Sequence, residues 1–228
     1  MLSFIYAIFQ VTFLFVLLVA RLITEEGVFE LSFHFPELKV NDELISFWDI
    51  PEFYISLVIA SFLMIWISMG VIALIVNKNP VNYIGLRRFR KSDYKWIVFS
   101  VVFIGIYGLI LFFLDLDFRP DFTFSNHLQI GFAFLSMALY VPLLEEIIFR
   151  GYLLTRLNEI FGNKLQLLSV IIVSVIFAFS HIYYPMSALV FIFFMSVFLC
   201  VMKLKTGNLW LAVILHMINN LLAVYFWI

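Results

Sequence analysis

The stretch Leu143–Leu157, LLEEIIFRGYLLTRL, places two adjacent carboxylates and a guanidinium inside an otherwise apolar run. The charged side chains are those of Glu145, Glu146 and Arg150. A charged side chain near the centre of a bilayer costs roughly 2.5–3.5 kcal/mol on insertion scales, so such groups usually face the interior of a helix bundle and carry function. The stretch therefore predicts a buried polar site within a membrane-embedded helix.

The composition places the chain among integral membrane proteins. Hydrophobic residues make up 64% of the sequence, charged residues 13%, and the mean hydropathy is +1.09, which no water-soluble core of this length requires. The net charge is −1 and the basic residues lie in short loops, so nucleic-acid binding is disfavoured. The single cysteine, Cys200, excludes an intramolecular disulfide and a multi-cysteine metal site.

Seven apolar runs follow one another, at residues 1–20, 53–76, 96–114, 128–157, 165–182, 186–202 and 209–227. About 20 apolar residues suffice to cross a bilayer as a helix. The sequence therefore predicts an all-α fold, a multi-pass transmembrane helical bundle of about seven spans that forms one membrane domain over residues 1–228. Six spans with a re-entrant piece around Tyr183–Ser187 also fit. The first run lacks the features of a cleaved signal peptide, so we expect a retained span.

Charge alternates between the predicted loops. The second, fourth and sixth loops are basic, whereas the first, 21–52, and the third, 115–121, are acidic. By the positive-inside rule, this pattern predicts a cell-membrane protein with a cytoplasmic N-terminus. The strongest basic cluster, at 77–95, is interpreted as an orientation signal in contact with anionic lipids. A weak alternation at 28–40 is compatible with a short hairpin or an interfacial patch.

Glu146 and Arg150 are four residues apart with the acid first, an order that favours an ion pair on one helix face. Glu145 points about a quarter turn away and has no cationic neighbour along its helix. Two interpretations stay open. Either the pair merely fixes the packing of helices, or Arg150 holds Glu146 while Glu145 takes part in proton transfer.

Two later runs carry histidines. The fifth ends in FAFSH, with Phe177 and His181 one turn apart, and the seventh contains HMINN, with His216 and Asn220 four apart. A lone intramembrane histidine commonly serves as a helix–helix hydrogen-bonding residue. Here, however, the intramembrane ionisable groups of the second half lie together in three predicted helices, the fourth, fifth and seventh runs. These groups are Glu145, Glu146, Arg150, His181 and His216. The other histidines lie in loops and are interpreted as solvated or interfacial: His34 and His127.

A glutamate, two histidines and an asparagine gathered from three helices form a familiar hydrolytic set. A carboxylate with a neutral imidazole can take a proton from water, while a second imidazole with an amide can stabilise an oxyanion. Alternatively, the glutamate and two histidines could hold a zinc ion. The sequence contains no H-E-x-x-H, no G-x-S-x-G and no Gly-rich phosphate loop, which excludes the commonest soluble-enzyme sites.

The motifs Glu145-Glu146-x-x-x-Arg150, Phe177-x-x-x-His181 and His216-x-x-x-Asn220 together resemble the CPBP family. This family comprises type II CAAX prenyl endopeptidases and bacteriocin-processing or self-immunity proteins. The resemblance covers a motif-bearing core at about 131–220. It implies a multi-pass intramembrane endopeptidase, a CAAX-type protease acting on peptide or protein substrates at the membrane. Apart from the motifs, the chain has no feature that points to prenylated substrates.

The resemblance also implies roles for individual residues. The implied catalytic set is Glu145, Glu146, Arg150, His181, His216 and Asn220. Glu145 and His181 would activate the water, and His216 and Asn220 would stabilise the oxyanion. Glu146 and Arg150 would brace the first motif. The family has both a glutamate-based and a zinc-type scheme, and in a metalloprotease the ligands would be Glu145, His181 and His216.

Two other functions compete with proteolysis. One is a non-catalytic membrane immunity or scaffold protein, and the other is a proton-coupled transporter, which no inverted repeat supports. The proposed site also poses a geometric difficulty. At about 1.5 Å per residue, simple end-to-end placement puts Glu145 nearer the basic side and His181 nearer the acidic side. We expect helix tilt and an irregular connection at Tyr183–Pro185 to bring both to one depth.

Overall fold

The computed structural model describes residues 37–40, 43–46, 51–113, 130–131, 134–182, 184 and 186–227. Several predicted features lie outside these ranges: the first span at 1–20, most of the first acidic loop, the third loop at 115–121, His34 and His127. Contacts divide the chain into two compact units, Met1–Ile50 and Pro51–Ile228. The prediction of one membrane domain over residues 1–228 stays a prediction.

The described part of the first unit is a β-hairpin. Strand β1 (Glu37–Val40) pairs with strand β2 (Glu43–Ser46) in antiparallel register, with Val40 opposite Glu43 next to the turn. The weak alternation noted at 28–40 overlaps strand β1, and the rest of it, 28–36, lies outside the described residues.

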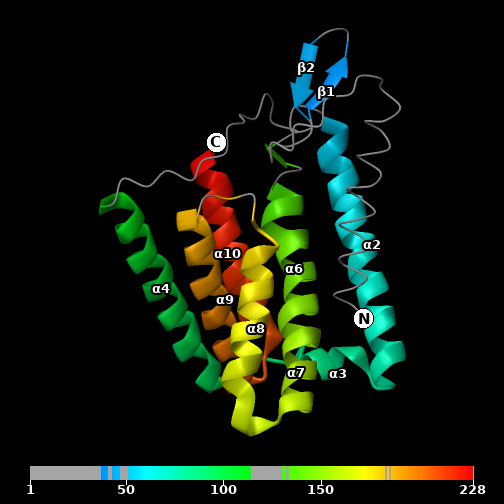
Figure 1. Cartoon of the computed structure of the whole chain (residues 1–228), viewed down its shortest axis with the longest axis vertical. Helices are drawn as coiled ribbons and strands as arrows, with labels where there is room; N and C mark the ends of the chain where they lie inside the picture. The colour runs from blue at the N-terminus through cyan, green and yellow to red at the C-terminus, as the bar shows by residue number, and fades with distance from the viewer. Residues whose placement is uncertain are drawn as a thin grey trace. The chain divides into compact units, whose positions relative to one another are not determined.

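The described part of the second unit is helical throughout. Its elements are α2 (Pro51–Val76), α3 (Pro80–Ile84), η2 (Lys91–Asp93), α4 (Tyr94–Phe113), η3 (Phe134–Tyr140), α6 (Val141–Glu146), η4 (Ile147–Leu153), α7 (Leu154–Phe161), η5 (Asn163–Leu165), α8 (Gln166–Phe179), α9 (Met186–Thr206) and α10 (Leu209–Trp227). The long helices form a bundle (Figure 1) and match the predicted second to seventh runs. Ser187 lies in the first turn of α9, whereas Tyr183 and Pro185 of the alternative re-entrant piece lie outside the described residues.

The fourth run is one continuous helix from Phe134 to Phe161 with two π-helical segments in it, η3 and η4. The π geometry pairs each carbonyl with the N–H five residues on, and such segments are frequent at functional sites. In η3 this pattern would pair the carbonyl of Met137 with the N–H of residue 142, but Pro142 has none. The π segment therefore ends there, and α6, which ends in the two glutamates, begins.

Several charged side chains are buried in the helical unit, and many large apolar side chains are exposed, unlike in a typical water-soluble protein. Glu145, Glu146, Arg150 and His216 are buried, whereas α2, α4 and α8 turn large apolar side chains outward. Trp66 and Val101 are each 65% exposed and Leu74 is 84% exposed. Many exposed large apolar side chains on these helices are typical of a surface that contacts a membrane or another protein.

The interior between α9 and α10 is an apolar cluster. It consists of Met195, Leu199, Met202, Leu211, Ala212 and Leu215. Helix α4 packs onto it through aromatic rings, of which Phe103 and Phe198 are stacked with centroids 4.9 Å apart. This packing fixes α10, which carries His216, against its neighbours.

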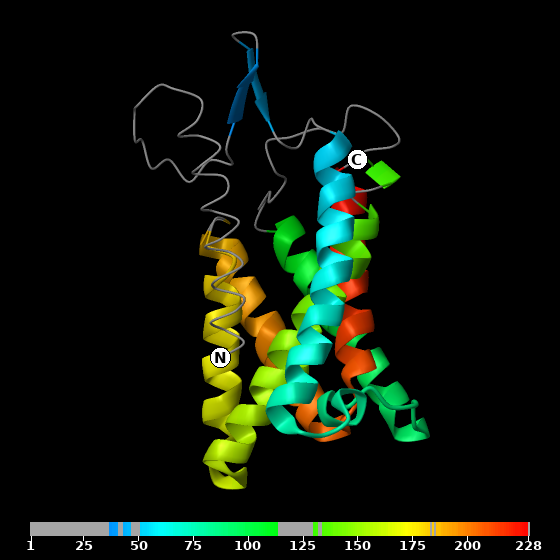
Figure 2. The same cartoon turned by 90° about the vertical axis from the view of Figure 1, so that its right-hand side faces the viewer.

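The three basic connections lie at the same end of the bundle, the lower end in Figure 1. Tyr83 of α3 donates a hydrogen bond to Glu159 of α7 at 3.0 Å, and the N–H of Leu209 donates to the carbonyl of Gly85 at 2.8 Å. Gly85 has φ +79°, and a Cβ there would collide with Lys203 Nζ and the carbonyl of Gly207. Figure 2 shows α3 and the α7–α8 connection at this end from a second side.

Among the described residues, one helix, α9, is long and apolar enough to cross a membrane. Shorter apolar helices cover Ser61–Val76, Gln166–Phe179 and Leu209–Ala223.

Candidate active site

Two of the three charged members of the first motif, Glu146 and Arg150, form a buried ion pair. Arg150 Nη1 donates to Glu146 Oε1 at 2.8 Å, and neither side chain is exposed to solvent. The same carboxylate oxygen lies 2.9 Å from Nδ1 of His216 on α10. Arg150 Nη2 donates to Ser196 Oγ on α9 at 2.8 Å. Glu146 and Arg150 thus join α6 and η4 to both C-terminal helices.

Glu145 faces the two histidines. Its Oε2 lies 3.6 Å from Nε2 of His216, and its Oε1 lies 3.9 Å from Nε2 of His181. Both separations are too long for a direct hydrogen bond, but each is short enough for one water molecule to bind both groups. Simple end-to-end placement of the helices was therefore wrong about the depth of Glu145 and His181, and the expected convergence is found. Helix α8 ends at Phe179, and His181 lies in the turn that follows.

The hydrogen bonds at Nδ1 fix which nitrogen of each neutral imidazole carries the proton. Nδ1 of His181 lies 2.9 Å from the carbonyl oxygen of Phe177, which can only accept, so Nδ1 is the donor. Nδ1 of His216 likewise donates to the carboxylate of Glu146. Each neutral ring therefore presents the lone pair of Nε2 toward Glu145.

Phe177 packs against three of these groups. Arg150 Cζ lies 4.1 Å from the ring centroid of Phe177, an attractive cation–π distance. The ring centroids of His181 and His216 lie 4.9 Å and 5.8 Å from that of Phe177. The Phe177 ring thus fills the space between the guanidinium and both imidazoles, and it provides the apolar wall of the site.

Asn220 lies one turn beyond His216 on α10 and binds the helix of the first motif. Its Nδ2 donates to the carbonyl of Met137 at 2.9 Å, the carbonyl that Pro142 leaves without its π-helical donor. Asn219 Nδ2 donates to Asn220 Oδ1 at 3.3 Å. The amide of Asn220 therefore ties α10 to the point where η3 gives way to α6.

The donor types at Glu145, His181 and His216 are those of a zinc site, with an Nε2 lone pair available on each neutral ring. Their arrangement is different. No group of three or more His, Cys, Asp or Glu forms a metal-binding cluster in the part of the chain that the structure describes. The two imidazoles approach different oxygens of Glu145. Nε2 of His216 lies 3.6 Å from Oε2, and Nε2 of His181 lies 3.9 Å from Oε1. In the described residues these three donors are therefore not assembled as a metal cluster.

The structure brings together five of the six predicted site residues by side-chain contacts and places the sixth, Asn220, against the backbone of Met137. Sequence reasoning missed Ser196, the acceptor for Arg150, because nothing in the run 186–202 distinguishes it from Ser187. It also gave Phe177 no role. The interval of four between Phe177 and His181 was the available signal for their contact.

Residues 127–222 match the family model described as Type II CAAX prenyl endopeptidase Rce1-like, a range that includes all six predicted site residues. No curated protein and no solved structure matches the chain. The match confirms the resemblance to the CPBP family drawn from the three motifs. Residues 127–222 are therefore similar to the Rce1-like family of type II CAAX prenyl endopeptidases, which supports a CPBP-family intramembrane protease.

Proposed function

We propose that the chain is an intramembrane endopeptidase that hydrolyses peptide bonds of membrane-associated substrates with a water molecule activated by Glu145. The match of residues 127–222 to the Rce1-like family model supports a protease that acts on peptide or protein substrates at the membrane. The observation that carries the proposal is the placement of Glu145 between the Nε2 atoms of His181 and His216. A carboxylate at such distances from two imidazoles leaves room for a shared water.

The proposed reaction begins with a water bound by Glu145 and the Nε2 lone pair of His181. Glu145 takes a proton from this water as the oxygen attacks the carbonyl carbon of the scissile bond, forming a C–O bond and an oxyanion. The proton then passes to the leaving nitrogen, the C–N bond breaks, and the products are a carboxylic acid and an amine.

His216 and Asn220 would stabilise the oxyanion. The Glu146 carboxylate holds Nδ1 of His216 and so directs Nε2 of that ring toward the site. A proton on Nε2 would be donated in a hydrogen bond to the developing negative charge. Asn220 has two N–H donors on Nδ2 and gives one of them to Met137. The second is the one that it would offer to the oxyanion.

The proposal places the helices across the cell membrane as a multi-pass bundle, with the basic end and the N-terminus in the cytoplasm. Three observations support this: the apolar outward faces of α2, α4 and α8, the length of α9, and the gathering of basic connections at one end. Impermeant maleimide labelling tests the orientation. Because the native Cys200 is buried, Arg88→Cys should be labelled only from the cytoplasmic side and Met186→Cys only from the other.

The test of the chemistry is cleavage of membrane-anchored peptides by the purified protein in nanodiscs, read by mass spectrometry. Glu145→Gln should lower the rate by about 10²–10⁴-fold, the usual contribution of a general base. Glu159→Gln, a partly exposed carboxylate on α7, is the matched control and should cleave normally. A folded Glu145→Gln protein with the wild-type rate would refute the proposal.

A chelator decides between the two schemes for activating water. We expect 1,10-phenanthroline to leave cleavage unchanged, because the donors at Glu145, His181 and His216 do not form a metal cluster in the described residues. Inhibition that added zinc reverses would instead assign these three side chains as ligands.

A further inference from the structure

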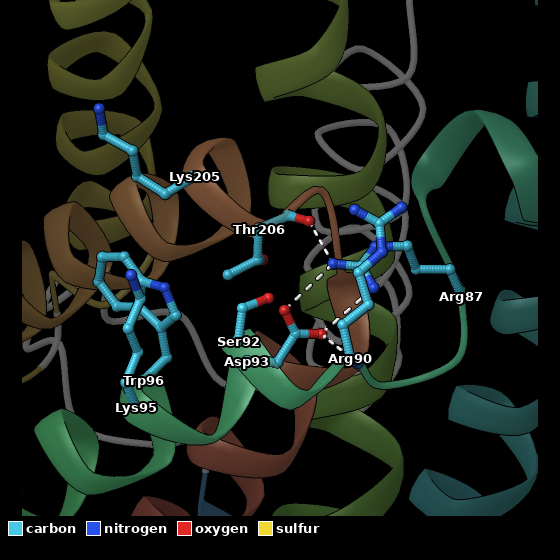
Figure 3. Close-up of a pocket in the computed structure, with 8 residues that line it drawn as sticks. All are labelled: Arg87, Arg90, Ser92, Asp93, Lys95, Trp96, Lys205 and Thr206. Atoms are coloured by element: carbon cyan, nitrogen blue, oxygen red, sulfur yellow. Dashed lines mark hydrogen bonds and ion pairs between the residues drawn. The ribbon is translucent and has the colours of Figure 1, made fainter.

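A polar pocket lies at the basic end of the bundle, between the start of α4 and the end of α9 (Figure 3). Its volume is about 190 Å³. Its lining includes Arg87, Arg90, Asp93, Lys95, Trp96 and Lys205. This pocket lies outside the site of Glu145 and the two histidines, and proteolysis gives it no role.

Asp93 organises the pocket from its buried side and is only 2% exposed. Its Oδ2 accepts from the backbone N–H of Arg90 at 3.0 Å and from Asn208 Nδ2 at 3.2 Å. Arg87 forms an ion pair with the same carboxylate at 3.2 Å and also donates to the carbonyl of Thr206, as Figure 3 shows. These contacts link the segment before α4 to the α9–α10 turn.

The charge left over in the pocket is positive. Asp93 compensates Arg87, and no carboxylate of the described residues forms an ion pair with Arg90, Lys95 or Lys205. All three of these cationic side chains are exposed. The positive end of the α4 dipole adds to their potential, because the pocket lies at the N-terminus of that helix. The pocket is therefore suited to an anion with several acceptor oxygens, such as a phosphate group.

The pocket includes Trp96 from the first turn of α4, a helix that also carries exposed apolar side chains. Trp96 lines it and packs against Phe99 and Phe198, with ring centroids 5.9 and 6.3 Å away. The exposed side chains that follow on α4 include Val98, 63% exposed, and Val101. A tryptophan between a basic site and an apolar face is typical of the membrane–water interface. The basic pocket and the apolar side chains of α4 together suit an amphiphilic ligand better than a free anion.

We propose that this pocket binds the phosphate group of an anionic membrane lipid, whose acyl chains lie against the exposed face of α4. Arg90, Lys95 and Lys205 contact the phosphate, while Asp93 holds Arg87 and the two loops in place. The inference rests on the membrane embedding proposed above and is independent of the cleavage chemistry. It assigns the basic end a specific lipid site in addition to a role in orientation.

The experiment measures lipid retention by the full chain. The protein is reconstituted in nanodiscs of phosphatidylcholine with phosphatidylglycerol and released for native mass spectrometry. The wild type should retain phosphatidylglycerol in preference to phosphatidylcholine. The double variant Arg90→Gln/Lys205→Gln should retain it at least about tenfold less, because each basic group near the surface contributes substantially to anionic-lipid binding. Both replaced side chains are exposed, so the fold should persist.

A matched control distinguishes lipid binding in the pocket from general electrostatic attraction to the basic end of the bundle. Arg88→Gln/Lys164→Gln removes the same charge at the same end of the bundle but outside the pocket, and it should retain lipid as the wild type does. Equal loss in both double variants, or no loss in either, would overturn the proposal. Inorganic phosphate that displaces phosphatidylglycerol at millimolar concentration would assign the site to a soluble anion and overturn the lipid source. Cleavage by the pocket variant should stay normal, which keeps this test separate from that of proteolysis.

Discussion

Nδ1 of His216 lies 2.9 Å from Oε1 of Glu146, and the same oxygen accepts a hydrogen bond from Arg150 at 2.8 Å. One carboxylate oxygen thus fixes the proton on His216 and neutralises a buried guanidinium. Glu146 has its partners within the fold, whereas Glu145, the adjacent residue, makes only longer approaches to the imidazoles. The two neighbouring carboxylates are therefore suited to different tasks, Glu146 to positioning and Glu145 to chemistry.

Glu146→Gln should destabilise the protein strongly. The substitution leaves Arg150 fully buried without a countercharge, and breaking a buried pair from one side typically costs about 3–5 kcal/mol. Glu145→Gln should cost much less, because the Glu145 carboxylate makes no ion-pair contact closer than 3.6 Å. Denaturant titration of both variants in detergent checks the difference. Similar stability of the two variants would contradict the separation of roles.

Ser196→Ala should also destabilise the protein, by about 1–3 kcal/mol, because it leaves the buried Arg150 Nη2 without an acceptor. Ser169→Ala on α8 is a matched control. Its hydroxyl is fully buried and has no hydrogen-bond partner among the described residues, so its removal should be neutral or stabilising. Thermal unfolding of both variants measures the contrast, and equal effects would show that Ser196 does not support Arg150.

Much of this arrangement could be predicted from the sequence. The apolar runs predicted the long helices, because lipid-facing helices need a continuous apolar sequence. The interval of four residues predicted the ion pair between Glu146 and Arg150. The contact between Glu146 and His216 could not be predicted. It joins residues 70 positions apart, and it depends on how α10 packs against α6. The two π segments were also missed, because the sequence signal for a π-helical turn is weak.

Asp93 should make stability depend on pH. Burial raises the pKa of its carboxyl, but the hydrogen bonds from the Arg90 N–H, Asn208 and Arg87 outweigh this effect and hold the pKa below its ordinary value. A carboxyl with a lowered folded-state pKa contributes stability at neutral pH and loses it as the pH falls through that pKa. Wild type should therefore unfold at a higher temperature than Asp93→Asn at pH 7. The gap should close in strongly acidic buffer, and a gap independent of pH would contradict the assignment.

The hydrogen bond from Asn220 Nδ2 to the carbonyl of Met137 should be energetically coupled to Pro142. The carbonyl needs this side-chain donor because Pro142 offers no N–H to it. Asn220→Ala should therefore destabilise the wild type by about 1–3 kcal/mol. Pro142→Ala supplies a backbone N–H that can pair with the Met137 carbonyl, so Asn220→Ala should cost less in that background.

A double-mutant cycle measured by denaturant unfolding gives the coupling, which we expect to be about 0.5–3 kcal/mol. Asn219→Ala in place of Asn220→Ala is the control, because no hydrogen bond joins Asn219 to Met137 in the described residues, and its cycle with Pro142→Ala should show little coupling. If the losses of unfolding free energy caused by Asn220→Ala and Pro142→Ala are additive, the hydrogen bond from Asn220 does not depend on the proline. Cleavage adds a second measurement. If Asn220 also binds the oxyanion, the Pro142→Ala background should recover stability in Asn220→Ala but not the rate.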